Sequence, residues 1–235
     1  MKLHIPSKNV LSIFSEQPSG YHYVQIYQNI TFQTETAAQY IQESLLKNEG
    51  IVVIAGIALR KAVTAKMQAL DLDISKFKSD GQIKFLDAEF LLSSFWVDGK
   101  INRNSFFQSV GIPIQALKLK YGKVHAMTEM SNFLWKQSLF DPAMQLEGLW
   151  HDLFRKQEFS LLCTYLVESL DPNTFEESLE RICQYHSHFK PIERVDSLEP
   201  STSDAIWNLF VEVWNRVISK IENSSQISSH IPPAK

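Results

Sequence analysis

The residues from Tyr27 to Thr34 occupy the place of a phosphate-binding loop, between a strand-like apolar run and a helix-like amphipathic run. Such a loop reads Gly-x-x-x-x-Gly-Lys-Thr, because glycines let backbone N–H groups surround a phosphate and the lysine reaches the outer phosphates. Here Tyr27 and Phe32 stand at the glycine positions, and Gln33 stands at the lysine position. Only Thr34 fits. The sequence therefore favours a domain kept for binding or signalling over one that performs nucleotide chemistry.

Two acidic residues follow expected strands, where open α/β sheets bind their ligands. Glu129 has two readings that stay open: it orients a ligand or a water, or it caps the next helix or pairs with a cation. For Asp87 a helix cap is favoured over a relic of a metal-holding acid. We predict a pocket at this edge bordered by Thr31, Asp87 and Glu129, with Tyr27 and Thr34 as further ligand-binding candidates.

The histidines and cysteines show no clear metal-ligand spacing. A lone strand histidine such as His22 is usually a core or edge residue, and Cys163 in an apolar run is expected to be a buried, inert thiol. His186 and His188, with Cys183 nearby, suit a metal only on an extended segment. We predict no metal site and no catalytic residue. The sequence specifies no cofactor.

The composition limits the classes of partner. The chain has 235 residues, 44% hydrophobic and 11% aromatic, so it can bury a full core. A net charge of -3 supplies no basic field for nucleic acid. No apolar stretch reaches the roughly 18 residues of a transmembrane helix, and residues 1–8 lack the apolar core of a signal peptide. We expect a cytoplasmic protein without nucleic-acid binding or membrane insertion.

Short apolar runs alternate with amphipathic segments, which predicts an α/β fold with a mainly parallel sheet of about five or more strands and helices on both faces. The expected strands are His22–Tyr27, Ile51–Ala55, Gln82–Leu86, Lys123–Met127 and Ser160–Leu166. Thr34 or Thr36 is expected to cap the first helix, and Asp141 a later one. Gly111-Ile112-Pro113 is expected to break a helical region.

The chain is expected to divide into three parts. Residues 1–196 form an α/β domain, residues 197–223 a linker and an amphipathic helix, and residues 224–235 a disordered tail. Apolar residues of Asp204–Ile221, including Trp207 and Trp214, form two adjoining stripes. The helix either packs back on the domain or takes part in a homodimer, which we predict because the second stripe would otherwise stay exposed.

Several short motifs occur in a characteristic order over roughly residues 20–193. They are His22 with Tyr27, Leu86-Asp87-Ala88-Glu89, Thr128-Glu129-Met130, Leu161-Leu162-Cys163-Thr164-Tyr165, and Ile182-Cys183 with His186-Ser187-His188. This order resembles the MEDS domain, a sensory domain named for methanogens, methylotrophs and the dichloromethane regulator. Three departures are Thr128 in place of Gly, Leu166 in place of Pro or Asp, and Phe189-Lys190 in place of an apolar pair.

The resemblance implies a KaiC/RecA-like three-layer sandwich without a working phosphate loop, and the sensing of small organic compounds. Residues implied by the family match are His22, Cys163, Tyr165, His186 and His188. The favoured function is a non-enzymatic sensory module that binds a small molecule and signals to a separate partner protein. The alternatives are a divergent nucleotide-binding ATPase or phosphotransferase, and a pure protein-interaction module.

Overall fold

A computed structural model of the chain describes residues 20–27, 29–166, 175–186, 188–190, 212–213, 215–216 and 219. Within them six strands form one sheet in the order β3-β2-β6-β7-β1-β8, and every neighbouring pair is parallel. The strands are β1 (His22–Tyr27), β2 (Gly50–Ala55), β3 (Ile83–Asp87), β6 (Val124–Thr128), β7 (Ser160–Leu166) and β8 (His188–Lys190). A separate antiparallel pair joins β4 (Trp96–Val97) to β5 (Lys100–Ile101). The predicted parallel sheet is confirmed.

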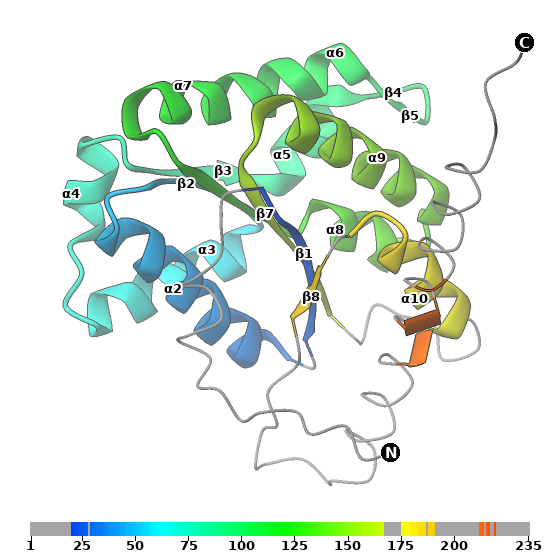
Figure 1. Ribbon diagram of the computed structural model, residues 1–235, viewed down its shortest axis with the longest axis horizontal. Coiled ribbons are helices and arrows are strands. Elements are labelled where there is room, and N and C mark those ends of the chain that lie inside the picture. The colour runs from blue at the N-terminus through cyan, green and yellow to red at the C-terminus, as the bar shows by residue number, and fades with distance from the viewer. Residues whose placement is uncertain are drawn as a thin grey trace, which may run out of the picture.

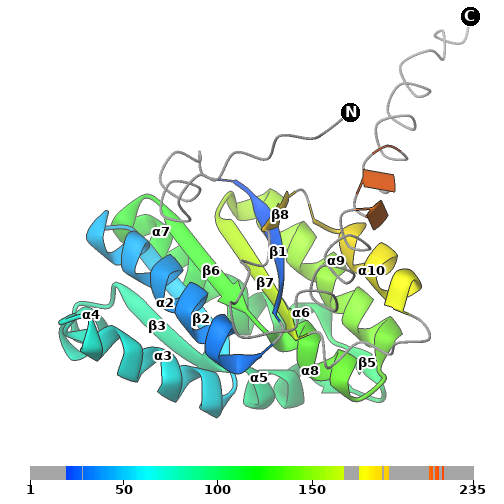
Figure 2. The same ribbon diagram turned by 90° about the horizontal axis from the view of Figure 1, so that it is seen from below.

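Helices cover both faces of the sheet (Figures 1 and 2). One layer contains α2 (Ile30–Leu46), α3 (Ile57–Ala69) and α4 (Ile74–Ser79). The other layer contains α5 (Ala88–Phe95), α6 (Arg103–Phe106), the π-helix η1 (Phe107–Gly111), α7 (Ile112–Tyr121), α8 (Met130–Lys136), α9 (Phe140–Gln157) and α10 (Phe175–Cys183). The chain thus has the α/β three-layer sandwich that the sequence predicts.

The central strands are buried on both faces because helices cover each of them. In β2, Val52 and Ile54 face the α9 layer, while Ile51 and Val53 face the α2 layer. Strand β1 follows the same alternation but contains buried polar residues, among them His22. Since side chains alternate along a strand, His22 points into the α9 layer with Val24 and Ile26.

The predicted start of the first helix is wrong. Helix α2 begins at Ile30, and its cap is Asn29, whose side chain accepts a hydrogen bond from the Phe32 backbone N–H at 3.0 Å. Asparagine is at least as good a cap as threonine, and Asn29 has the extended backbone typical of a cap. The helix therefore starts before the predicted caps Thr34 and Thr36. Thr31 and Thr34 therefore lie in the first turns of α2, and only two residues connect β1 to this helix.

Two further expectations are corrected in the α9 layer. Helix α9 begins at Phe140, so Asp141 lies in its first turn and pairs with Arg181 instead of capping the helix. Gly111-Ile112-Pro113 does not break the helical region, since η1 runs directly into α7. A proline near the start of α7 is tolerated because the preceding turn already has a wider hydrogen-bond spacing.

Most of the predicted terminal helix, and all of residues 167–174, lie outside the described part of the chain. Val213 is described, and it is fully buried in the core of the α9 layer. None of the helices in the described ranges has the length and apolar character needed to cross a membrane.

Candidate functional site

The place predicted for a missing phosphate loop is filled by side chains that bond to one another. Tyr27 is buried and donates its hydroxyl hydrogen to Gln25 Oε1 at 2.9 Å. Gln33 is fully buried, and its Nε2 donates to Glu129 Oε2 at 3.3 Å and to Thr164 Oγ1 at 3.0 Å. The side chain at the position of a phosphate-binding lysine is thus directed into the protein.

Glu129 lies directly after β6 and is 6% exposed. Its Oε1 accepts the Gly56 backbone N–H at 2.5 Å, at the first turn of α3. Burial raises the pKa of Glu129, and the hydrogen bonds from Gly56 and Gln33 oppose that rise. A carboxylate at a helix N-terminus is favoured by the helix dipole, so Glu129 holds α3 against the end of β6.

Asp87 is the cap of α5, as the sequence predicts, and accepts the Phe90 backbone N–H at 3.0 Å. Its other carboxylate oxygen pairs with Arg60 of α3. Thr31 is exposed, and Thr34 donates to the Ile30 carbonyl oxygen at 2.8 Å. Asp87 and Thr34 thus have local roles in their helices, and the pocket predicted between Thr31, Asp87 and Glu129 stays a prediction.

Three large apolar side chains are exposed along the carboxyl edge of the sheet. Ile30, Ile57 and Phe90 belong to the first turns of α2, α3 and α5, the helices that follow β1, β2 and β3, and they are 43%, 56% and 70% exposed. We call these three residues together the edge patch. Strands β6 and β7 lie between β1 and β2, so Ile30 follows a strand distant from those before Ile57 and Phe90, and Phe90 belongs to the α9 layer. Phe90 donates its backbone N–H to Asp87, one of the residues predicted from the sequence.

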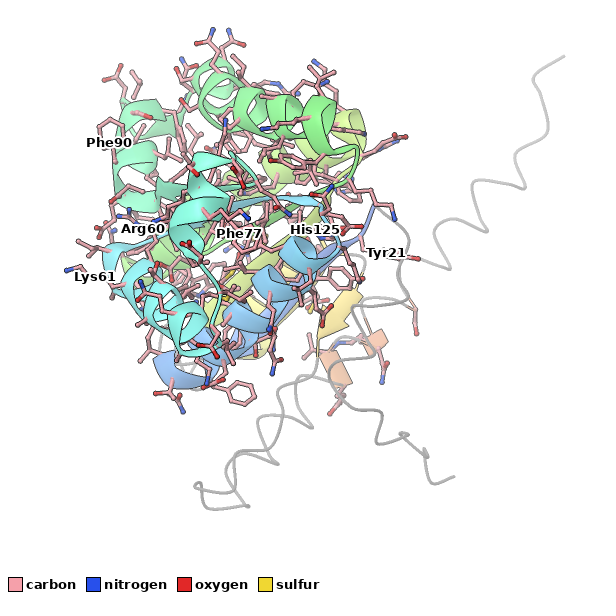
Figure 3. All side chains as sticks on the ribbon, turned by 90° about the vertical axis from the view of Figure 1, so that its left-hand side faces the viewer. Tyr21, Arg60, Lys61, Phe77, Phe90 and His125 are labelled. Carbon is pink, nitrogen blue, oxygen red and sulfur yellow. The ribbon has the colours of Figure 1, made fainter. Side chains whose placement is uncertain are left out.

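A groove begins at the same edge and runs along α3 toward β3. Its lining is Ile57, Arg60, Lys61, Thr64, Ala65, Gln68, Lys78 and Phe85. Figure 3 shows Arg60, Lys61 and Phe90 on the left side of the view, with Tyr21 on the opposite side and His125 next to it. The edge therefore combines exposed apolar surface with cationic side chains.

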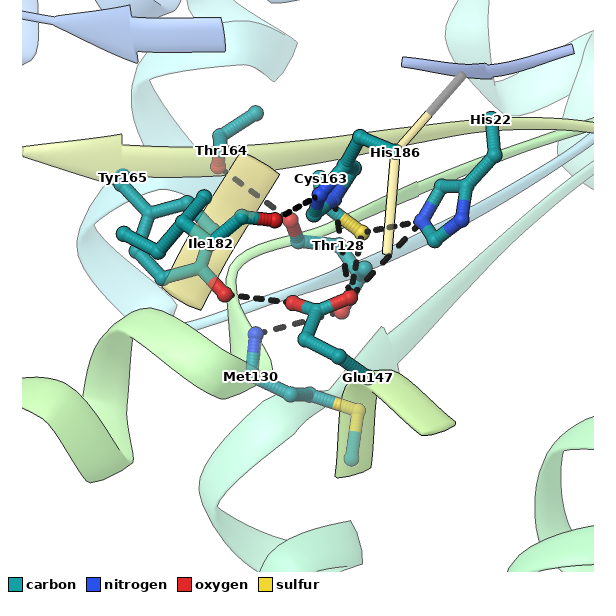
Figure 4. Close-up of polar contacts among 9 residues, drawn as sticks. All are labelled: His22, Thr128, Met130, Glu147, Cys163, Thr164, Tyr165, Ile182 and His186. Carbon is teal, nitrogen blue, oxygen red and sulfur yellow. Dashed lines mark hydrogen bonds and ion pairs between the residues drawn. The ribbon is translucent and has the colours of Figure 1, made fainter. Parts of the chain in front are cut away.

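A second set of polar side chains lies inside the α9 layer (Figure 4). His22 of β1, Glu147 of α9, Cys163 of β7 and His186 after α10 are all fully or nearly fully buried. We call these four residues the buried cluster. In the β1–β7 register Leu161 is the partner of His22, so Cys163 lies two residues further along β7 and faces the same layer.

The polar atoms of the buried cluster approach one another closely. His22 Nε2 is 3.3 Å from Cys163 Sγ and 3.7 Å from Glu147 Oε2. Glu147 Oε2 is 3.5 Å from Cys163 Sγ and 3.6 Å from His186 Nε2. The other oxygen, Glu147 Oε1, accepts the Tyr165 hydroxyl at 2.5 Å.

Burial governs the ionisation of the cluster. It lowers the pKa of His22, as do the charges of His186 and His151. It also lowers the pKa of His186, although the Glu147 carboxylate and the Ile182 backbone oppose this shift. For Cys163, burial and then Glu147 raise the pKa of the thiol.

His22, Cys163, Tyr165 and His186 are expected as site residues only through the family resemblance, and Glu147 is not among the residues predicted from the sequence. One signal was available, because Glu147 lies on the apolar face of α9 with Ala143 and Trp150, where a carboxylate is costly. His188 lies in β8, opposite Tyr23 of β1.

Comparisons with known proteins give a family match and similarities to solved structures. Residues 21–181 match the family described as MEDS: MEthanogen/methylotroph, DcmR Sensory domain. Among solved structures, the chain is similar to a KaiC-like protein from the hyperthermophilic archaeon Pyrococcus horikoshii, with 14% sequence identity and a TM-score of 0.46. That similarity covers 64% of this chain and 62% of the other, which is less than two thirds of its length. The search of curated proteins gave no match.

Proposed function

Because the chain belongs to the MEDS family of sensory domains, we propose that it is a non-enzymatic sensory module that binds a small molecule and signals to a separate protein. The observation that carries the proposal is the family match, which spans residues 21–181 and so includes most of the described sheet. The proposal has three parts, which are the binding of a small molecule, the signalling partner and the lack of catalysis.

The arrangement around Gln33 supports a role without nucleotide chemistry. A phosphate site needs free backbone N–H groups and a cation at the start of the helix. Here the Asn29 side chain takes the Phe32 N–H, and the Gln33 amide is bonded to Glu129 and Thr164. These contacts argue against the ATPase or phosphotransferase alternative.

The edge patch supports a ligand site at the carboxyl edge. Exposed apolar side chains along the carboxyl edge of a parallel sheet, with polar groups among them, are typical of binding sites. Ile30, Ile57 and Phe90 supply apolar surface, while Arg60 and Asp87 supply charge that can orient a polar group. We place a short organic molecule there, in contact with Thr31 or Thr34 on the α2 side and near Glu129 below. The same exposed surface also suits the alternative of a pure protein-interaction module.

A thermal-shift screen of the full chain tests this assignment. The panel contains short alcohols, halogenated alkanes and carboxylic acids, with magnesium and ATP as a separate arm. The proposal expects at least one organic compound to raise the melting temperature in a saturable way, and expects no effect of ATP. An interaction module predicts no hit in either arm, and an ATPase predicts a shift with ATP.

Two matched variants locate the hit. Phe90→Ser removes the most exposed side chain of the edge patch, and Leu119→Ser removes a side chain that is 80% exposed on α7. The proposal expects Phe90→Ser to weaken binding of the compound by about tenfold, in line with the loss of one buried aromatic contact. Leu119→Ser should leave binding unchanged, and an equal effect of both variants contradicts the assignment.

Signalling to another chain and homodimer formation belong to the same proposal. The residues predicted to form the dimer, from Asp204 to Ile221, are described only in part, and buried Val213 favours packing of this segment on the domain. Light scattering on the full chain and on a chain that ends at Pro200 decides between the two. A full-length dimer that becomes monomeric on truncation supports the homodimer, and a full-length monomer removes it.

A further inference from the structure

The buried cluster has the composition and spacing of a metal site. We propose that His22, Glu147, Cys163 and His186 bind one divalent metal ion, with zinc as the preferred ion, in a closed tetrahedral site between the sheet and α9. The inference does not depend on the proposed ligand site, which lies at the carboxyl edge of the sheet. It differs from the sequence prediction of no metal, because residues far apart in sequence meet only in the folded chain.

The distances between the four side chains match a tetrahedron of zinc ligands. Ligand bonds of about 2.0–2.3 Å place the ligand atoms of a tetrahedral zinc ion about 3.3–3.8 Å apart. Four of the six ligand-to-ligand distances are 3.3, 3.5, 3.6 and 3.7 Å. All four ligand atoms lie within 4.8 Å of one another. The side chains therefore need only small movements to take up a metal.

The ring of His186 is oriented as a ligand. Its Nδ1 is 2.7 Å from the Ile182 carbonyl oxygen, and a carbonyl can only accept, so Nδ1 carries the hydrogen. The neutral ring then presents a lone pair at Nε2, which faces the cluster and has no hydrogen-bond partner among the described residues. A backbone carbonyl that fixes the tautomer in this way is the usual outer partner of a metal-bound histidine.

Tyr165 holds the Glu147 carboxylate in place. Its hydroxyl donates to Oε1 at 2.5 Å, and this leaves Oε2 directed at Cys163 and both histidines. Tyr165 is thus a positioning residue for one carboxylate oxygen. Such an outer contact typically changes metal affinity about 10- to 100-fold when it is removed.

Charge also favours a cation at the centre. Glu147 is fully buried, and a buried carboxylate needs a compensating charge. In the part of the chain that the structure describes, the ion partners recorded for Glu147 are the two histidines, with no lysine or arginine. A divalent ion supplies that charge and stabilises the thiolate form of Cys163.

Four protein ligands leave no open position for a substrate, which is typical of structural rather than catalytic zinc. The ion would join β1 and β7 of the sheet to α9 and to the segment after α10. A surface groove is lined in part by Gly148 and Tyr185, the sequence neighbours of Glu147 and His186.

Metal analysis of the intact chain tests the proposal. The full chain is stripped with a chelator and titrated with zinc and with cobalt, the spectroscopic probe for such sites. We expect one equivalent of zinc per chain, a higher melting temperature with zinc, and a cobalt spectrum with tetrahedral bands and a thiolate charge-transfer band. Wild-type chain that takes up neither ion at micromolar concentration overturns the proposal, and the cluster is then a hydrogen-bonded polar network.

Variants identify the ligands. Cys163→Ser should abolish the charge-transfer band and weaken zinc binding by about 100-fold or more, while Tyr165→Phe should weaken it by about tenfold and keep the band. The matched controls are Cys183→Ser, the other buried thiol, and His125→Ala, a histidine that contacts Tyr40 of α2 on the other face of the sheet and pairs with Glu49. Both controls should bind zinc as the wild type does. A charge-transfer band that survives Cys163→Ser, or that is lost in Cys183→Ser, contradicts the assignment. If Cys163→Ser folds poorly, the wild type and Tyr165→Phe still test the site, because both keep the Cys163 thiol.

Discussion

Two carboxylates that the fold buries differ in the partners that surround them. Glu129 accepts a backbone N–H from Gly56 and an amide hydrogen from Gln33. Glu147 accepts a phenol and lies beside a thiol and two imidazoles. The first set of partners is typical of a carboxylate that fixes a helix end, and the second set is typical of metal ligation. Residue type alone does not distinguish the two roles.

Glu129 should make the stability of the chain depend on pH. Burial raises its pKa, so the folded chain holds this proton to a higher pH than the unfolded chain does. The folded state then binds more protons than the unfolded state, and the free energy of unfolding falls as pH rises from about 4.3 through the raised pKa. Glu129→Gln should remove this part of the slope.

Urea denaturation at a series of pH values from about 4.5 to 7 measures this dependence of stability on pH. The window begins just above the ordinary glutamate pKa of about 4.3, because the pKa of Glu129 is raised. The control is Glu177→Gln, which removes an exposed carboxylate. A wild-type slope that Glu129→Gln leaves intact, or that Glu177→Gln removes equally, shows that Glu129 is not the group responsible.

At the scale of elements, the starts of the helices were the hardest feature to predict. Asp87 was predicted correctly because a cap directly after a strand is a local signal. Asn29 was missed as the cap of α2 because Thr34 and Thr36 are also suitable cap residues. The choice among the three depends on the length of the β1–α2 connection, which the sequence pattern does not specify. The predicted cap Asp141 lies two residues after the observed cap, Leu139, because α9 already begins at Phe140.

The start of α3 offers a direct test of packing at the carboxyl edge. A Cβ on Gly56 would lie 2.6 Å from Phe133 Cζ and 3.1 Å from Glu129 Oε1. Gly56→Ala must therefore displace the Phe133 ring and disturb the hydrogen bond to Glu129. We expect it to lower the free energy of unfolding by about 1–3 kcal/mol, as overpacking does.

Gly148→Ala is the matched control, since its Cβ would meet only the Tyr185 ring, at 3.7 Å. Because Gly148 lies inside α9, alanine should leave stability unchanged or raise it by up to about 1 kcal/mol. Chemical denaturation of both variants gives the comparison. Equal stability of the two variants shows that the contact at Gly56 relaxes without cost.

For the whole molecule, the sequence predicted the sheet better than the sites. Continuous apolar runs such as Ser160–Leu166 predict a strand covered on both faces, and β7 has these bounds. The buried cluster depends on contacts between residues up to 164 positions apart, His22 and His186, which come together only through the strand order and the return of the chain after α10. No local pattern contains that information.

The chain as a whole should not hydrolyse ATP. Gln33 is bonded to Glu129 and Thr164 at the place where an ATPase has its lysine, and Tyr27 is buried at a glycine position. Purified chain with magnesium and ATP should release phosphate no faster than buffer does. Turnover that disappears in Thr34→Ala would show that the site still performs nucleotide chemistry.

The most direct test of the sensory account is methyl-resolved NMR of the full chain, labelled at isoleucine, with the organic compound that stabilises it most. The account predicts saturable shifts of the Ile30 and Ile57 methyl signals, because both belong to the edge patch. The signal of Ile112, which is 63% exposed on α7, should not move. Shifts confined to Ile112, or no saturable shift with any compound of the panel, would contradict the claim that this edge of the sheet binds a small molecule.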